Sequence, residues 1–388
     1  MSRRVIDRLR PWSAPLAPTD APCVAVIGAG PAGLATAALL RRSGVGAVVL
    51  DRRDDVGGSW PERYDSLRLN TVRWMSDLPG LRMSRRSGRW VGREDLVAYL
   101  RAYAEHHRLE TRLGASGGVT RVDRSDRGWT LTVAGATDQF AGVVVATGHS
   151  QQPVTPDWPG APGFEGKLSH SAEYRRPSDH RDARVLVVGA GSSGGEICVD
   201  LAGAGVDVTW SVRTAPRVFP REVLGLPATP FAPSAEHLPD RVIDTIAPWA
   251  ERQIYGKRDY LPEPTTPMME LLAHCKEPMT ADGIVDMVRR GAVRVVAAVE
   301  DLDAAGARLV DGAHVAADHV VTATGYRPGL EPVVGHLGVL DDDGRPTAAV
   351  LHGTLGFVGF RIPFTGTLWA IEQDARTVAA ELAAAVRR

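Results

Sequence analysis

The stretch VAVIGAGPAG, residues 24–33, decides the fold of this chain. Its first four residues form a continuous apolar run, which is typical of a parallel strand buried on both faces. The glycines that follow have the spacing of a tight turn that lets the backbone approach a pyrophosphate, and a proline here suits the first turn of a helix. We therefore expect a dinucleotide to be bound at this turn by Gly28, Gly30, Pro31, Ala32 and Gly33.

The residues after this turn complete a strand–helix–strand unit. Helix-forming residues run from Leu34 to Ser43, and a second apolar run covers Ala47 to Leu50. This run ends at Asp51, 23 residues after Gly28, where a ribose-binding carboxylate is expected. An acid at this position binds a ribose 2′-hydroxyl and repels a 2′-phosphate. The first site therefore predicts FAD, or another cofactor with a free 2′-hydroxyl, with Asp51 and Arg52 among its contacts.

A second glycine-rich stretch, VLVVGAGSSG at residues 185–194, repeats the plan. An apolar run again precedes the glycines, a helix is expected over Gly194–Leu201, and another strand is expected over Val206–Val212. An arginine, rather than an acid, closes this strand, and a guanidinium there pairs with a 2′-phosphate. We therefore expect NADPH rather than NADH at the second site, held by Gly189, Gly191, Ser192, Ser193, Gly194 and Arg213.

Similar segments follow both units and indicate an internal duplication. Residues 119–133 alternate as in a hairpin and lead into Val143–Gly148, and residues 293–315 lead into Val320–Gly325. Both of these later segments contain Ala-Thr-Gly. The expected fold class is α/β, with two Rossmann-like dinucleotide-binding domains and the NADPH domain inserted in the FAD domain. We expect a flexible N-terminal arm at 1–20, an FAD domain at 21–160 plus 318–388, and an NADPH domain at 165–317 with an irregular helical lobe at about 220–280.

Composition and charge exclude several other classes of protein. The net charge of −1 gives no electrostatic footprint for nucleic acid or an anionic membrane. The three cysteines form no Cys-x-x-Cys pair, which argues against a metal site and a redox dithiol, and no apolar run is long enough to span a bilayer. We therefore expect no metal and no membrane contact, and a cytoplasmic location.

The segment between the two expected domains carries a further pattern. Residues 164–174 read FEGKLSHSAEY, in which Phe164, Gly166, His170 and Tyr174 match the fingerprint F-x-G-x-x-x-H-x-x-x-[YF] of the flavin-containing monooxygenases. The chain resembles this family over nearly its whole length, because the two glycine-rich stretches flank the fingerprint in the family's order. The spacing of Trp210 to Arg213, the Pro220-Arg221-Glu222 segment and Phe357 to Phe360 are most similar to the plant YUCCA-type branch.

The resemblance implies one catalytic side chain and further cofactor contacts. Asn70 corresponds to an asparagine that animal and bacterial members carry beside the flavin, a position at which YUCCA-type members usually differ. A neutral amide there can hydrogen-bond the NADP ribose or the oxygenated flavin without protonating it. The resemblance favours a structural hinge role for His170, and implies that a final helix over Trp369–Arg387 directs its N-terminus at the flavin. The other implied contacts are Gly58, Ser59, Trp60, Leu69, Thr147, Tyr174, Thr324, Gly325 and Gln373, with Asn70 also touching a cofactor.

The resemblance implies an FAD- and NADPH-dependent monooxygenase. One oxygen atom would pass from a C4a-(hydro)peroxyflavin to a nucleophilic nitrogen or sulfur of a small molecule. Two alternatives stay open: Baeyer–Villiger oxidation or oxidative decarboxylation of a 2-oxo acid, and a non-oxygenating NADPH-dependent flavoprotein oxidase or redox sensor. A dithiol reductase shares the fold but lacks support, since the paired cysteines are missing. The expected partners are a small-molecule substrate, dioxygen and, at most, a second copy of the chain.

Overall fold

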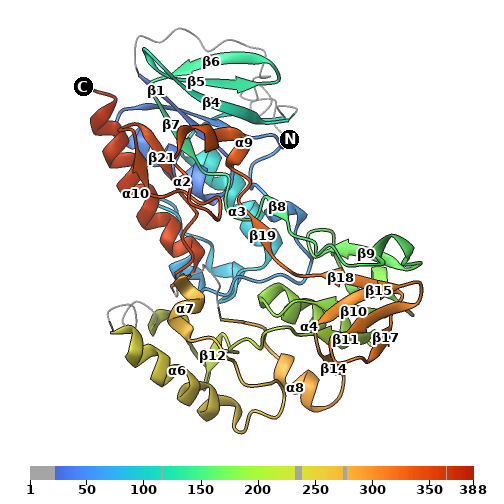
Figure 1. Cartoon of the computed structure of the whole chain (residues 1–388). Helices are drawn as coiled ribbons and strands as arrows, with labels where there is room; N and C mark the ends of the chain where they lie inside the picture. The colour runs from blue at the N-terminus through green and yellow to red at the C-terminus, as the bar shows by residue number, and fades with distance from the viewer. Residues whose placement is uncertain (1–21, 115–116, 232–237, 274–277, 364) are drawn as a thin grey trace.

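The computed structural model describes residues 22–114, 117–231, 238–273, 278–363 and 365–388, and the expected arm at 1–20 lies outside them. Two mainly parallel sheets form the two halves of the molecule, and both expected Rossmann-like units are present. In Figure 1 the first half lies at the top with α10 along its side, and the second half lies at the lower right. The α/β fold class predicted from the glycine-rich stretches is confirmed.

The first sheet is built around the first glycine-rich stretch. Its strand β1 pairs in parallel with β2 on one side and with β7 on the other. Helices α2 (Pro31–Arg42), α3 (Arg93–His106) and α10 (Thr367–Ala385) share one apolar core with this sheet. The strand order is β20 (Val350–Leu351), β21 (Leu355–Phe357), β7 (Gly142–Val145), β1 (Cys23–Ile27), β2 (Gly46–Leu50), β3 (Glu110–Arg112).

A small antiparallel sheet covers the other face of the first sheet. Residues Ala25, Ile27 and Val48 of the first sheet pack there against Trp129 and Leu131. The helix α9 (Glu331–Val334) packs against the same small sheet. The hairpin expected over 119–133 is present and gains a third, largely polar strand that the apolar pattern could not show. The three strands are β4 (Val119–Ser125), β5 (Gly128–Val133) and β6 (Ala136–Phe140).

The second sheet repeats this arrangement. Strand β10 follows the plan of β1, and helices α4 (Ser192–Gly203) and α8 (Ile284–Arg289) cover one face. The other face packs on β15 (Val299–Asp303), β16 (Gly306–Leu309) and β17 (His314–Ala316). The strand order is β14 (Val293–Val296), β11 (Asp207–Ser211), β10 (Arg184–Val188), β18 (His319–Thr322), β9 (Lys167–His170).

One expected domain boundary is wrong by a strand. We placed residue 318 at the return to the first domain, but β18 lies between β10 and β9 in the second sheet. The internal duplication explains the difference. Strand β18 corresponds to β7, and it pairs with β10 of its own sheet just as β7 pairs with β1. The chain returns to the first half after Thr322, through β19 (Tyr326–Arg327), which pairs with the outgoing β8 (Gln152–Pro153).

Separate hairpin and helical elements occupy the region where we expected a lobe, at about 220–280. It contains the hairpin of β12 (Glu222–Val223) and β13 (Leu226–Pro227), followed by α6 (Asp240–Tyr255) and α7 (Met268–Ala273). A buried carboxylate anchors α6, since Glu251 accepts hydrogen bonds from Tyr260, at 3.0 Å, and from Arg217. No helix among the described residues has the length and apolar character required to cross a membrane.

Candidate active site

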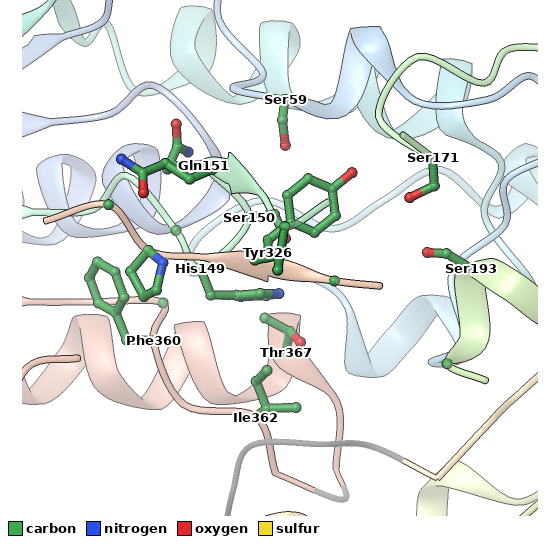
Figure 2. A pocket seen from close by; sticks show the side chains of 18 of the residues that line it. Ser59, His149, Ser150, Gln151, Ser171, Ser193, Tyr326, Phe360, Ile362 and Thr367 are labelled. Atoms are coloured by element: carbon green, nitrogen blue, oxygen red, sulfur yellow. The ribbon is translucent and has the colours of Figure 1, made fainter. Parts of the chain in front are cut away.

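A cavity of about 1360 Å³ lies between the two halves of the molecule. Both glycine-rich turns contribute to its wall, together with the hinge strands β8 and β19. Figure 2 shows part of it, with Tyr326 on β19 between Ser59 of the first half and Thr367 at the start of α10. The cavity is thus large enough, and placed correctly, for two dinucleotides that meet between the domains.

The first glycine turn leaves bare backbone facing the cavity. Gly28 has a φ of +113°, and a Cβ there would lie 2.5 Å from the carbonyl oxygen of Ala146. A Cβ on Gly33 would lie 1.8 Å from the carbonyl oxygen of Gly28, so this position needs glycine for close packing of the helix on the turn. Gly30 differs: its Cβ would meet only the Cα of Gly58, at 3.9 Å, and the residue lines the cavity. Gly30 is therefore where a pyrophosphate can approach the backbone.

Asp51 is fixed at the end of β2, as the spacing predicts. It lines the cavity, and its two carboxylate oxygens accept hydrogen bonds from the amides of Ala29, at 2.7 Å, and Arg53, at 2.9 Å. Each oxygen keeps a second lone pair for a ribose hydroxyl. Further along this wall, the side-chain oxygen of Thr147 is buried without a hydrogen-bond partner among the described residues. These features fit an adenine dinucleotide with a free 2′-hydroxyl.

The second glycine turn has the same construction. Gly189 has a φ of +123° and touches the backbone of Ala323, and a Cβ on Gly194 would lie 2.2 Å from the carbonyl oxygen of Gly189. A Cβ on Gly191 would meet nothing within 4 Å, so this residue offers the open approach. Arg213, two residues after the end of β11, lines the cavity and is exposed. The second turn thus fits a dinucleotide that carries an extra phosphate.

Most of the other expected contacts also line the cavity. They come from the starts of α2 and α4, from the residues after β2, and from the Ala-Thr-Gly segments that follow β7 and β18. They are Pro31, Ala32, Arg52, Gly58, Ser59, Trp60, Leu69, Asn70, Thr147, Ser192, Ser193, Thr324 and Gly325.

Four expected cofactor contacts do not line the cavity. Gly33 and Gly194 instead face the backbone of Gly28 and Gly189, where they allow close packing of each helix on its turn. The other two, Gln373 and Tyr174, lie elsewhere. Gln373 is on the exposed side of α10, because the face that carries Leu368 and Ile371 is the one turned to the cavity and core. Tyr174 is buried inside the second half, where its hydroxyl donates a hydrogen bond to Asp200 at 2.7 Å. Neither residue lines the cavity.

His170, at the end of β9, contacts Gly325 in the segment where the chain returns to the first half. Its Nδ1 accepts a hydrogen bond from the amide of Ala172 at 3.1 Å, so Nε2 carries the proton and donates to the carbonyl of Gly325, also at 3.1 Å. Burial lowers the pKa of His170, which keeps the ring neutral. This geometry supports the structural role that we expected for His170.

The sequence did not single out two charged groups beside the cavity. Arg63 lines it, donates to the hydroxyl of Tyr326 at 2.9 Å, and lies over that ring with its guanidinium carbon 5.1 Å from the centroid. Arg221 donates from Nε to the side-chain oxygen of Asn70 at 2.9 Å. Both contacts join residues more than 150 positions apart in the chain, which no local pattern reveals.

Comparison with known proteins identifies the family. A family profile described as pyridine nucleotide-disulphide oxidoreductase matches residues 25–222. A probable indole-3-pyruvate monooxygenase, YUCCA1 of Arabidopsis thaliana, is 31% identical over 366 residues, which cover 92% of this chain and 88% of that protein. The chain belongs to the flavin-dependent monooxygenases. It is an NADPH-dependent flavoprotein monooxygenase, and its cofactors are FAD and NADPH.

A second relative agrees with this assignment, and solved structures share the fold. The indole-3-pyruvate monooxygenase YUCCA1 of Oryza sativa subsp. japonica is 34% identical over 315 residues, covering 80% of this chain and 78% of that protein. A flavin-containing monooxygenase from Stenotrophomonas maltophilia shares the fold of this monooxygenase with a TM-score of 0.70 at 24% identity, over 94% of this chain and 99% of that one. Cyclohexanone monooxygenase from Rhodococcus sp. Phi1, bound to NADP+, shares it with a TM-score of 0.70 at 22% identity, over 96% and 85%.

Proposed function

We propose that this monooxygenase acts on a 2-oxo acid by oxidative decarboxylation. The 2-oxo acid, dioxygen, NADPH and a proton would give the acid shortened by one carbon, carbon dioxide, NADP+ and water. The observation that carries the proposal is the similarity, at 31% and 34% identity over most of the chain, to proteins named indole-3-pyruvate monooxygenases. Of the alternatives that the sequence left open, this reaction now has the most support.

Different residues of the cavity would bind each of the two cofactors. When bound, FAD reduced by NADPH supplies the electrons that activate dioxygen. Gly30 and Gly191 let phosphates reach the backbone, Asp51 binds a ribose, and Arg213 selects the extra phosphate of NADPH. Walls from both halves surround the space between them, which limits the access of water to the reaction.

Arg63 is the residue that we propose binds the substrate carboxylate. Among the described residues its side-chain partners are neutral: the hydroxyls of Tyr326 and Ser59 and the Tyr326 ring. The cavity arginines Arg53 and Arg217, by contrast, are each paired with a glutamate. No carboxylate therefore balances the positive charge of Arg63 among these partners, and its planar guanidinium can donate two parallel hydrogen bonds to a carboxylate.

A substrate panel tests this proposal. NADPH consumption, carbon dioxide and peroxide are measured with aryl and alkyl 2-oxo acids, with amines and with neutral sulfides. We expect 2-oxo acids to give carbon dioxide in a one-to-one ratio with NADPH. Carbon dioxide formation no greater than without substrate, for every 2-oxo acid, would contradict the proposal.

A variant of Arg63 provides a second arm. Arg63→Ala should raise KM for a 2-oxo acid by roughly 10- to 100-fold, because a charge-assisted hydrogen bond is lost. KM for NADPH serves as the internal control, and Arg63→Lys should recover part of the loss. An equal rise in both KM values would assign Arg63 to the cofactor instead.

Oxygen transfer to nitrogen or sulfur is the second candidate, and Asn70 favours it. The amide lines the cavity at the position where the resemblance places the asparagine of animal and bacterial flavin-containing monooxygenases. Product formed from a sulfide or amine, with no carbon dioxide from any 2-oxo acid, would decide for this candidate. NADPH converted entirely to peroxide with every compound would instead indicate a non-oxygenating oxidase.

A further inference from the structure

Arg221 reaches from the NADPH-binding half to Asn70 of the FAD-binding half. Its Nε donates to Asn70 Oδ1 at 2.9 Å, its Nη2 donates to Glu196 at 2.8 Å, and its Nη1 lies 3.3 Å from Asp282. Only 11% of its side chain is exposed. Arg221 does not line the cavity, whereas Asn70 does. Any influence of Arg221 on the reaction must therefore pass through the residues that it holds.

The chemistry of this contact fixes which way the amide of Asn70 faces. A guanidinium has donors and no acceptor, so the atom of Asn70 that it contacts must be the carbonyl oxygen. The amide NH₂ is then the group left for the cavity, and Nδ2 has no hydrogen bond to any described residue. Without Arg221, the amide could turn over and present an acceptor in place of a donor.

Arg221 is itself held in place by the second half of the molecule. Glu196 lies on α4, two residues after the glycine-rich stretch, and also accepts a hydrogen bond from the hydroxyl of Tyr64. Asp282 accepts a hydrogen bond from the backbone amide of Arg221 at 3.1 Å. These contacts leave the guanidinium one remaining direction, toward Asn70.

We propose that Arg221 is a positioning residue that keeps the NH₂ group of Asn70 directed into the flavin cavity. Because Arg221 belongs to the NADPH-binding half, the orientation of the Asn70 donor depends on how that half is docked. The donor helps retain activated oxygen at the flavin, and its loss lets NADPH, a proton and dioxygen pass to NADP+ and hydrogen peroxide. This inference is independent of which substrate accepts the oxygen.

The test measures peroxide formation from NADPH in air with no substrate added. Arg221→Ala and Asn70→Ala should each raise this rate by about five- to tenfold, the ratio that one lost hydrogen bond supplies. The double variant should be no faster than either single variant, because Arg221 acts through Asn70. Rates that multiply in the double variant, or an unchanged rate in Arg221→Ala, would overturn the proposal.

Glu222 provides a matched control next to Arg221. It accepts hydrogen bonds from two residues of the other half, Trp90 at 2.7 Å and Arg89 at 3.0 Å, but makes no contact with Asn70. Glu222→Ala therefore removes a separate contact between the halves and keeps the hydrogen bond from Arg221 to Asn70, and it should leave the peroxide rate near that of the wild type. A rise equal to that of Arg221→Ala would mean that docking alone explains the effect.

Two further experiments add readouts that do not depend on turnover, a melting temperature and a flavin spectrum. Asn70→Asp keeps an oxygen for Arg221 and loses the donor, so it should melt near the wild-type temperature while its peroxide rate rises like that of Asn70→Ala. The absorbance change of bound oxidised flavin on titration with NADP+ should be altered in Arg221→Ala and largely restored in Arg221→Lys. If Arg221→Ala shows the same spectral change as the wild type, the proposal that Arg221 sets the orientation of the Asn70 amide would be contradicted.

Discussion

We predict that a single side chain, Arg213, decides which nicotinamide dinucleotide the second site accepts. The residue follows β11 where an acid would bind the ribose of NADH, and it faces the cavity. Arg213→Ala should raise KM for NADPH by roughly 10- to 150-fold, because a charge-assisted bond of about 1.5–3 kcal/mol is lost, and should change KM for NADH little. Arg308→Ala, an exposed arginine paired with Asp301 outside the cavity, is the control. An unchanged preference would remove Arg213 from the site.

At this scale the sequence predicted residues whose roles follow from local spacing. Gly28, Asp51 and Arg213 lie where a strand end and a turn must place them. The expected cofactor contact of Gln373 does not line the cavity, because such a contact depends on which face of α10 is turned inward. The packing of α10 on the first sheet determines that face. Arg63 and Arg221 were not proposed as site residues, because an arginine becomes significant only through a partner that tertiary structure brings to it.

We predict that the glycine turn before α2 is the element that binds FAD. Gly30→Val should leave the protein folded but colourless, since a side chain there enters the cavity rather than the protein interior. Flavin absorbance relative to protein absorbance measures the loss, and circular dichroism checks the fold. The matched variant Gly33→Ala should instead lower the melting temperature, because its Cβ would lie 1.8 Å from a backbone oxygen. A yellow Gly30→Val protein would contradict the assigned approach.

Most of the helices and strands discussed above could be predicted from apolar runs and from the glycines and prolines that end them. The observed β1 and α2 begin and end within a few residues of the expected positions, because apolar runs and glycines mark these elements. Strand β6 was missed, since ATDQF has no apolar alternation. The sheet that β18 joins could not be read from its own residues, since VVT fits either sheet equally well and the choice depends on pairing with β10.

The docking of the two halves makes the stability of the whole molecule depend on pH. Burial raises the pKa of Glu196 to about 7, although Tyr64 and Arg221 both act to lower it. The native state therefore holds this proton more tightly than the unfolded state, whose value is near 4.5. Stability from this group is present at low pH and is lost as the pH rises toward 7.

Glu196→Gln isolates this contribution. The free energy of unfolding, measured with urea between pH 5 and pH 8, should fall with pH more steeply in the wild type than in the variant. The difference in slope has an upper limit of ~1.4 kcal/mol per pH unit for one proton. Identical slopes would show that Glu196 titrates normally. Taking the difference between proteins cancels the histidines, such as His170, that titrate in both.

We propose that each half of the molecule binds one cofactor, FAD at the first glycine turn and NADPH at the second. Anaerobic mixing of the oxidised, flavin-loaded protein with NADPH or NADH tests it most directly, with the flavin absorbance near 450 nm recorded over time. We predict bleaching by NADPH at concentrations well below those needed for NADH, and loss of this difference in Arg213→Ala. A protein that binds no flavin, or whose flavin NADPH leaves oxidised, would contradict the account.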